Sequence, residues 1–111
     1  MKIITKEILQ AFAKQGYTGN KSASDIKIVM KLFNPTGAGT WYLYEKEDDD
    51  IYWGFVNLGD PDCAECGTVS MQELMAFKGM FELGIERDMS FKPFSKTLEE
   101  VQNIIFSGGH V

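Results

Sequence analysis

Residues 40–58 read TWYLYEKEDDDIYWGFVNL, and this stretch predicts the centre of a β-sheet. Aromatic and β-branched residues fill both of its ends, as they do in strands. The acidic run Glu47–Asp50 between them is typical of an exposed turn. The stretch therefore predicts a hairpin with strands at 40–45 and 51–58. A lone glycine inside the second strand, Gly54, indicates a bulge or a close approach of two backbones.

Periodic patterns predict one helix and one strand before this hairpin. Apolar residues recur at every fourth position from Ile4 to Phe12, which predicts a helix over residues 5–14, and Gly16 is placed to end it. Over residues 25–32 the period changes to two, which predicts a half-buried strand. Four apolar residues are expected to share one face of that strand: Ile26, Ile28, Met30 and Leu32.

After the hairpin, the sequence predicts a short fourth strand at 67–69 and then two helices. Two Ser/Thr-x-x-Glu patterns begin at Ser70 and Thr97. Each is the signature of a capping box, in which the hydroxyl and the carboxylate both bond to backbone N–H groups at the start of a helix. The apolar residues that follow predict helices over 70–81 and 97–105.

The connections between the predicted strands are shorter than the dozen or so residues that a parallel crossover needs. We therefore expect an α+β fold, an antiparallel four-stranded meander sheet with an N-terminal helix and two C-terminal helices packed on one face. At this length, residues 1–111 are expected to form a single domain. No apolar run reaches the roughly 18 residues of a membrane helix, and the charged start does not resemble a signal peptide, so the expected compartment is the cytoplasm.

Composition and charge exclude several classes of protein. With 44% hydrophobic and 24% charged residues, the chain is not a disordered tail, a collagen-like fibre or a coiled coil. Residues 1–33 carry six lysines against two carboxylates, whereas residues 34–91 carry twelve carboxylates against three basic residues. This acidic middle repels phosphate, so direct nucleic-acid binding is not expected. Neutralising Glu47–Asp50 is expected to leave stability nearly unchanged, because solvent screens exposed charges.

The two cysteines form one Cys-x-x-Cys pair, Cys63 and Cys66. A structural zinc ion needs four ligands, and the only histidine, His110, lies near the C-terminus, so such a site would need a second copy of the chain. A redox role needs a lowered thiol pKa, whereas nearby carboxylates such as Asp60 and Asp62 raise it. We expect ordinary loop cysteines and no metal or other cofactor, with metal and redox roles as the alternatives.

No phosphate loop, dinucleotide fingerprint, zinc-protease helix or serine elbow occurs, and a single terminal histidine argues against Ser-His and Cys-His catalysis. The acid–base chemistry left open is that of two carboxylates in a dry cleft. No catalytic residue is assigned, and the carboxylates that could take part are Glu45, Glu65, Glu73, Glu86 and Asp88.

The most specific hypothesis about a site concerns Glu45 and its partner. Alternation places it on the same face as Trp41, and a carboxylate at the edge of a core needs a partner. Arg87 is the only arginine and can hold two carboxylates at once, so we expect it to contact Glu45 or Glu65. These residues and Asp88 are predicted to meet beside Trp41 as one polar cluster.

Aromatic residues crowd the hairpin. Those on the face away from the core, Tyr42, Tyr44 and Tyr52, would form an exposed patch unless helices cover them. Exposed aromatic patches more often bind a protein than a small ligand. An unidentified protein partner is therefore expected.

A series of motifs runs through residues 28–98 in a specific order. It comprises KLFNP at 31–35, TWYLYE at 40–45, GFV at 54–56, ECGTVS at 65–70, EL at 73–74 and GIERD at 84–88. Together these motifs resemble an uncharacterised bacterial family, a domain of unknown function found in small proteins often encoded on plasmids and integrative conjugative elements. The family pattern has a leucine where Cys66 stands and an aromatic residue where Thr68 stands. The resemblance implies no activity, and its motif positions include Asn34, Pro35, Thr40, Trp41, Glu45, Glu65, Glu73, Arg87 and Asp88.

Three function classes follow from these observations. The favoured one is a protein-binding accessory factor of a mobile genetic element, so that a binding protein is expected rather than an enzyme. The second is a small carboxylate-dependent enzyme. The third is an acidic decoy that imitates DNA, although −5 is sparse beside one charge per about 1.7 Å of DNA axis. A concave pocket with converging carboxylates would favour the enzyme, and an aromatic face the binding protein.

Overall fold

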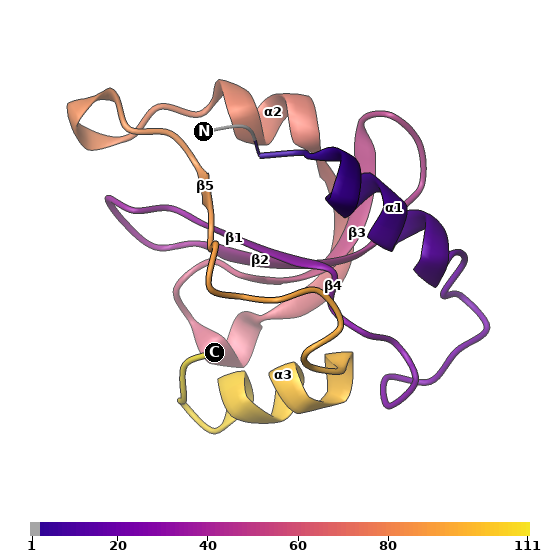
Figure 1. Ribbon diagram of the computed structural model, residues 1–111. Coiled ribbons are helices and arrows are strands. Elements are labelled where there is room, and N and C mark those ends of the chain that lie inside the picture. The colour runs from indigo at the N-terminus through magenta and orange to yellow at the C-terminus, as the bar shows by residue number, and fades with distance from the viewer. Residues whose placement is uncertain (1–2) are drawn as a thin grey trace.

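The computed structural model describes residues 3–111 as a five-stranded antiparallel sheet between helices (Figure 1). The strand order is β4-β3-β2-β1-β5, and β1 to β4 form the predicted meander. The strands are β1 (Met30–Phe33), β2 (Thr40–Lys46), β3 (Ile51–Asn57), β4 (Glu65–Ser70) and β5 (Glu86–Arg87). The helices are α1 (Lys6–Gln15), α2 (Met71–Ala76) and α3 (Leu98–Phe106), with short 3-10 helices η1 (Pro61–Cys63) and η2 (Met80–Glu82). The α+β class is confirmed.

The predicted number of four strands is wrong by one. β5 pairs antiparallel with β1, with Arg87 opposite Leu32 and Glu86 opposite Phe33. A strand of two residues has no alternation that a sequence pattern could reveal. The sheet therefore ends in β5 on one side and in β4 on the other.

The helices cover both faces of the sheet, and the prediction that all of them pack on one face is wrong. α1 and α2 lie on one face and α3 on the other (Figure 1). In β2, Trp41 and Leu43 belong to the hydrophobic cluster beneath α1, whereas Tyr42 and Tyr44 belong to the cluster beneath α3. A sheet buried on both faces has near-continuous apolar strands, which is the character of the hairpin sequence.

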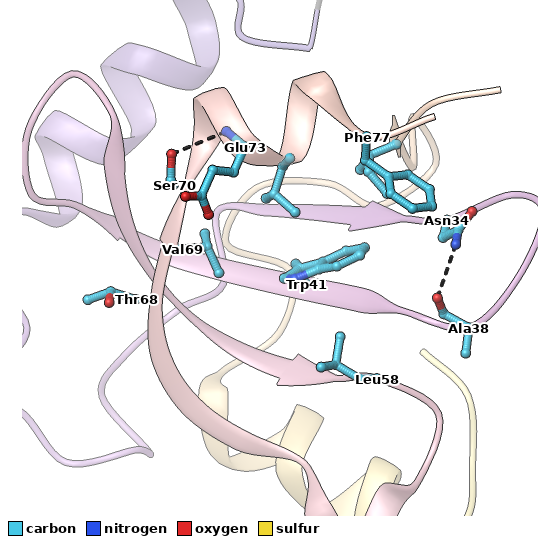
Figure 2. Close-up of a pocket in the computed structure, with 11 residues that line it drawn as sticks. Asn34, Ala38, Trp41, Leu58, Thr68, Val69, Ser70, Glu73 and Phe77 are labelled. Carbon is cyan, nitrogen blue, oxygen red and sulfur yellow. Dashed lines mark hydrogen bonds between the residues drawn. The ribbon is translucent and has the colours of Figure 1, made fainter. Parts of the chain in front are cut away.

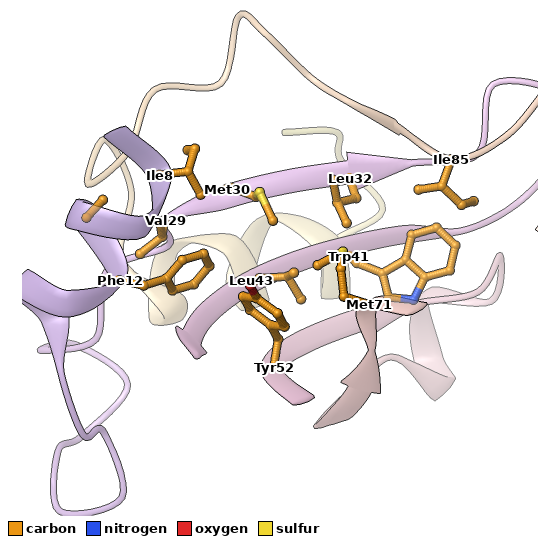
Figure 3. Close-up of a cluster of buried hydrophobic side chains, with 11 residues drawn as sticks. Ile8, Phe12, Val29, Met30, Leu32, Trp41, Leu43, Tyr52, Met71 and Ile85 are labelled. Carbon is orange, nitrogen blue, oxygen red and sulfur yellow. The ribbon is translucent and has the colours of Figure 1, made fainter. Parts of the chain in front are cut away.

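The three tyrosines expected to form an exposed patch unless helices cover them are covered: Tyr42, Tyr44 and Tyr52 are all buried. Tyr52 lies on the opposite face from the other two, in the cluster drawn in Figure 3. Its ring meets that of Phe12 from α1 edge to face, with 5.2 Å between the ring centroids. The aromatic side chains of the hairpin therefore fill the two cores.

The predicted strand over 25–32 is only partly present, since the sheet strand begins at Met30. Ile26 and Ile28 pack in the α3 cluster, whereas Met30 and Leu32 pack on the other face. The four residues therefore do not share one face, as the sequence predicted. The backbone explains the change, because Ile28 bonds to the segment before α3: its N–H donates to Lys96 O at 2.9 Å and its carbonyl accepts from Phe94 N at 2.9 Å.

Gly54 confirms the predicted close approach. The pairing of β2 with β3 shifts register between Leu43 and Glu45, opposite Gly54 and Trp53. A Cβ atom at position 54 would lie 2.6 Å from Leu43 Cδ2 and 2.9 Å from the carbonyl oxygen of Tyr42. Only glycine fits at this bulge without moving backbone.

α2 is shorter than the predicted helix over 70–81. It ends at Ala76, and Phe77 has an extended backbone with ψ 134°. Residues 77–84 then turn back on themselves, where Gly79 N donates to Leu83 O at 2.8 Å. The helices at 5–14 and 97–105 are confirmed within a residue of their predicted bounds, and Thr97 and Glu100 form the predicted capping box. None of the helices in the described part of the chain has the length and apolar character needed to cross a membrane.

Candidate functional site

The structure does not bring the predicted polar cluster together. Glu65 is on β4 and Arg87 on β5, at opposite edges of the sheet. Arg87 pairs with Leu32 of β1, and Leu32 in turn pairs with Trp41 of β2. Glu45 lies four residues further along β2, so Arg87 is far from it. The expected contact of Arg87 with Glu45 or Glu65 is therefore wrong, because the sequence pattern did not reveal β5 and so could not place Arg87.

Each member of the predicted cluster other than Glu65 has a different partner. Arg87 Nη1 donates to Ile3 O at 3.4 Å, and its other nitrogens contact the sulfur of Met89 at 3.0 and 3.2 Å. Asp88 forms an ion pair with Lys31 at 3.2 Å. Hydrogen bonds from Ser90 and the Lys31 ion pair lower the pKa of the Asp88 carboxyl.

Glu45 lies on the face of Trp41 and Leu43, as predicted, but its partner is a threonine. The side chain is 9% exposed, and its Oε1 accepts hydrogen bonds from Thr18 N at 2.8 Å and Thr18 Oγ1 at 2.6 Å. Thr18 belongs to a polar loop in which no sequence signal marked it. Glu45 borders a hollow next to α1 that is also lined by Tyr17 and Glu47, and its known contacts support a structural role.

A groove crosses the face of the sheet that carries α2, and we call it the Trp41 groove; Figure 2 shows its first pocket. It consists of two adjoining pockets of about 430 and 420 Å³ that share four lining residues, Trp41, Leu58, Thr68 and Val69. The first pocket lies beneath α2 and adds Glu73, Leu74 and Phe77 to the wall. The second extends toward η1 and adds Asp60, Glu65 and Gly67.

Trp41 is central to both pockets. The residue is 9% exposed and packs against Ile85 and Met71 in the cluster beneath α1 and α2 (Figure 3). Its indole Nε1 makes no hydrogen bond to any residue in 3–111, and no polar side-chain atom in that range is both buried and unpartnered. The N–H is therefore accessible from the groove, where it offers one hydrogen-bond donor.

Among residues 3–111, Glu73 is the only charged residue that lines the first pocket. The predicted capping box at Ser70 forms only in part: Ser70 Oγ accepts from Glu73 N at 3.2 Å, but the Glu73 carboxylate does not return to the helix start. Asp50 caps the same helix at another N–H group, because its Oδ1 accepts from Gln72 N at 2.7 Å. The Glu73 carboxylate has no hydrogen bond or ion pair within the described residues, so it is available to a ligand.

Asn34 shapes the end of the groove without offering its own polar atoms. Its Oδ1 accepts from Thr36 N at 3.1 Å and its Nδ2 donates to Ala38 O at 3.2 Å, which holds the turn between β1 and β2 closed. Gly79 of the 77–84 turn packs on this loop, since a Cβ there would lie 2.3 Å from Thr36 Oγ1. Asn34 is therefore a positioning residue.

Four of the residues at the family's motif positions line the Trp41 groove: Asn34, Trp41, Glu65 and Glu73. Pro35 lies in the turn beside Asn34, and Thr40 begins β2. Periodicity alone could not gather these positions, because they come from β2, β4, α2 and a turn. The family resemblance was the one sequence signal that grouped them.

β4 is the free edge of the sheet next to this groove. Its six residues pair with β3 on one side only, and none of them makes a further backbone hydrogen bond within residues 3–111. Edge strands are usually protected by lysine, proline or a covering element. β4 contains no lysine or proline, and Glu65 is its only charged residue. A row of N–H and C=O groups is thus left open beside the groove.

Exposed apolar side chains surround the groove. Leu58 and Phe77 line it and are exposed, and the 77–84 turn adds Met80, Phe81 and Leu83. Phe81 is 83% exposed and has φ 59°, a left-handed conformation that bulky residues rarely adopt. Strained backbone of this kind is common at binding sites.

Cys63 lies at the far end of the groove, whereas the thiol of Cys66 faces α3 on the other side of the sheet, where its Sγ accepts from Gln102 Nε2 at 3.7 Å. Both are free and exposed, with Cys63 in η1 and Cys66 in β4, so only Cys63 lies outside a strand. Cys63 Sγ donates to Asp60 Oδ2 at 3.4 Å, and this bond and the Asp60 charge raise the pKa of the thiol. Although Cys66 as a whole is exposed, its sulfur is partly buried toward α3, and this burial raises the pKa of the thiol. Among residues 3–111, no three His, Cys, Asp or Glu side chains gather as metal ligands would.

Comparison with known proteins places the chain in a family without assigning an activity. Residues 3–104 match the model of a family described as a protein of unknown function, DUF2958. No curated protein and no solved structure matches the chain. The match covers the motifs that line the groove and nearly all of the sheet and helices. The chain therefore belongs to the DUF2958 family of proteins of unknown function.

Proposed function

We propose that this protein binds an extended segment of a partner protein along the free edge of β4, with alternate side chains entering the Trp41 groove. The observation that carries the proposal is the unpaired six-residue edge beside a groove that has an accessible indole N–H and an unpaired carboxylate. Strand addition of this kind takes its affinity from main-chain hydrogen bonds and its specificity from pockets for alternate side chains.

The exposed apolar residues support a macromolecular partner. Leu58 and Phe77 line the groove and are exposed, so a bound segment would cover them and remove apolar surface from water. Contiguous exposed apolar surface on a small protein commonly marks an interaction site. The role of an accessory factor of a mobile genetic element is the finer form of this proposal, and its support is the resemblance of the motifs.

The two alternative functions have weaker support. An enzyme that uses two carboxylates needs them close together and free to act in one pocket. Among the described residues, Glu73 is the only carboxylate lining the first pocket, and of the two that line the second, Asp60 already accepts from Asp62 N and the Cys63 thiol. A DNA mimic needs a row of unpaired charges, but three carboxylates of the acidic turn accept internal hydrogen bonds: Glu47 from Trp53 Nε1, Asp48 from Ile51 N and Asp50 from Ser70 Oγ.

A random peptide display library tests the proposal. Peptides selected on the wild-type protein should bind much more weakly to a Gly67→Phe variant, whose side chain fills the groove. A Cβ at Gly67 meets no atom within 4 Å, so this variant should fold normally. Asn103→Phe adds the same side chain to the exposed surface of α3, on the opposite face, and is the matched control.

N-methylation of each backbone amide of a selected peptide then tests the strand geometry. In an antiparallel or parallel edge pairing only alternate N–H groups of the peptide point to the protein. Loss of binding should therefore follow a period of two along the peptide. Failure to select any peptide, or equal binding to Gly67→Phe, would contradict the proposal.

A further inference from the structure

We infer that the first pocket of the Trp41 groove receives a lysine or arginine side chain of the bound segment. The inference rests on the proposed function and specifies the chemistry of the partner. It starts from the charge of the groove. Among the residues that line the two pockets, all within the described chain, three are carboxylates and none is Lys, Arg or His: Asp60, Glu65 and Glu73.

Only part of this negative charge is used inside the protein. Asp60 caps η1 by accepting from Asp62 N at 3.0 Å and also accepts from the Cys63 thiol. Glu65 and Glu73 form no ion pair within residues 3–111, where the two ion pairs are Lys31–Asp88 and Lys46–Asp49. A cation entering the groove would thus meet carboxylates that no protein cation already neutralises.

The shape and polarity of the first pocket fit a long basic side chain. Val69, Leu74 and Phe77 provide apolar walls for the methylene stem, and Glu73 provides an acceptor for the charged head. The indole N–H of Trp41 is a second, independent feature, because it is an unpartnered donor on a side chain that is nine-tenths buried. A donor cannot pair with a cation, but it can bond to a main-chain carbonyl of the segment that carries it.

A second copy of this chain is a poorer occupant. Antiparallel pairing of two β4 edges would set the Glu65 end of one copy beside the Ser70 end of the other, so that Glu65 of each copy would approach Glu73 of the other. Each copy also carries a net charge of −5. Like charges placed together at an interface oppose association, whereas a basic segment is attracted.

The peptides selected on the wild-type protein provide the first test. Lys or Arg should be enriched at one position, and replacing that residue by citrulline (for Arg) or norleucine (for Lys) should weaken binding about five- to tenfold, as expected for one exposed charge-assisted contact. Glu73→Gln should weaken binding of the basic peptide by a similar factor and leave binding of the neutral analogue unchanged. Glu99→Gln, on α3 at the opposite face, is the matched control, and it should change the binding of neither peptide.

The outcomes separate the inference from the proposal beneath it. Peptides that bind in a Gly67-dependent way without any basic preference, or with no response to Glu73→Gln, would overturn the inference and leave strand binding intact. Failure to select peptides would overturn both. A dimer detected by sedimentation that Gly67→Phe dissociates would show that a second copy occupies the edge, which also overturns the inference.

Discussion

Asp50, in the turn between β2 and β3, accepts a 2.7 Å hydrogen bond from the hydroxyl of Ser70 at the start of α2. The same aspartate accepts from Gln72 N at 2.7 Å through its other oxygen and from Met71 N at 2.8 Å through its carbonyl. Together with the bond from Glu73 N to Ser70 Oγ, these contacts satisfy the first three N–H groups of α2. The acidic turn thus caps α2, the helix whose residues Glu73 and Leu74 line the groove.

We predict that Asp50→Ala destabilises the protein by about 1–2 kcal/mol, because it removes a helix cap. This replaces the sequence-based expectation that the whole acidic run is neutral to stability. Asp49→Ala is the matched control: Asp49 is fully exposed, and its only bond is the ion pair with Lys46, so stability should not change. Urea denaturation measures both, and equal effects of the two substitutions would contradict the capping role.

Loss of the Thr18 hydroxyl should be costly because the Glu45 carboxylate that it binds is buried. Thr18→Val keeps the shape of the side chain and removes the donor, so we expect a loss of about 1–3 kcal/mol. Thr18→Ser retains the hydroxyl and should therefore retain most of the stability that Thr18→Val loses. Arg87→Ala should lower the free energy of unfolding less than Thr18→Val does, because Arg87 does not pair with Glu45. The opposite ranking in chemical denaturation would restore the polar cluster predicted from the sequence.

Alkaline pH should destabilise the fold through its buried tyrosines. Burial raises the pKa of Tyr42 to about 12 and also raises those of Tyr44 and Tyr52 above the ordinary value of 10.0. A raised pKa in the folded state gives stability that is present below pH 10.0 and is lost as pH rises toward the folded value. Tyrosinate absorbance of the folded protein should therefore rise at higher pH than that of the protein in urea. Superimposable titration curves would contradict the burial of these residues.

The sequence predicted the α+β class, the hairpin and two of the three helices well, because these depend on local periodicity and capping. It could not predict β5, which is two residues long, or the face that each helix covers. It also missed where Ile26 and Ile28 pack, because their alternation continues into β1 while their backbone bonds to the segment before α3. In each case a long-range pairing overrode the local pattern.

The site was predicted less well for the same reason. Placing Glu45 on the Trp41 face needed only alternation and was correct, but its partner depended on tertiary placement. Thr18 lies in a loop without a distinctive pattern, whereas Arg87 was chosen for its chemistry alone. Glu73 shows the converse: the capping-box pattern assigned its carboxylate to the helix start, whereas in the structure that carboxylate lines the groove and Asp50, distant in sequence, caps α2 instead.

The thiols of Cys63, at the end of the groove, and of Cys66, which faces α3, should both react slowly. The hydrogen bond from Cys63 to Asp60 stabilises the protonated thiol, and burial does the same for Cys66, so both pKa values lie above the ordinary range. At about pH 8, alkylation by iodoacetamide should be slower at both residues than in free cysteine. Asp60→Asn should accelerate alkylation of Cys63, because it removes the Asp60 charge and weakens the hydrogen bond that the thiol donates. Asp62→Asn, which removes a weaker charge effect, is the matched control and should accelerate alkylation of Cys63 less. Mass spectrometry of each modified peptide follows the two sites separately, and a Cys63 that reacts faster than free cysteine would indicate an activated thiol instead.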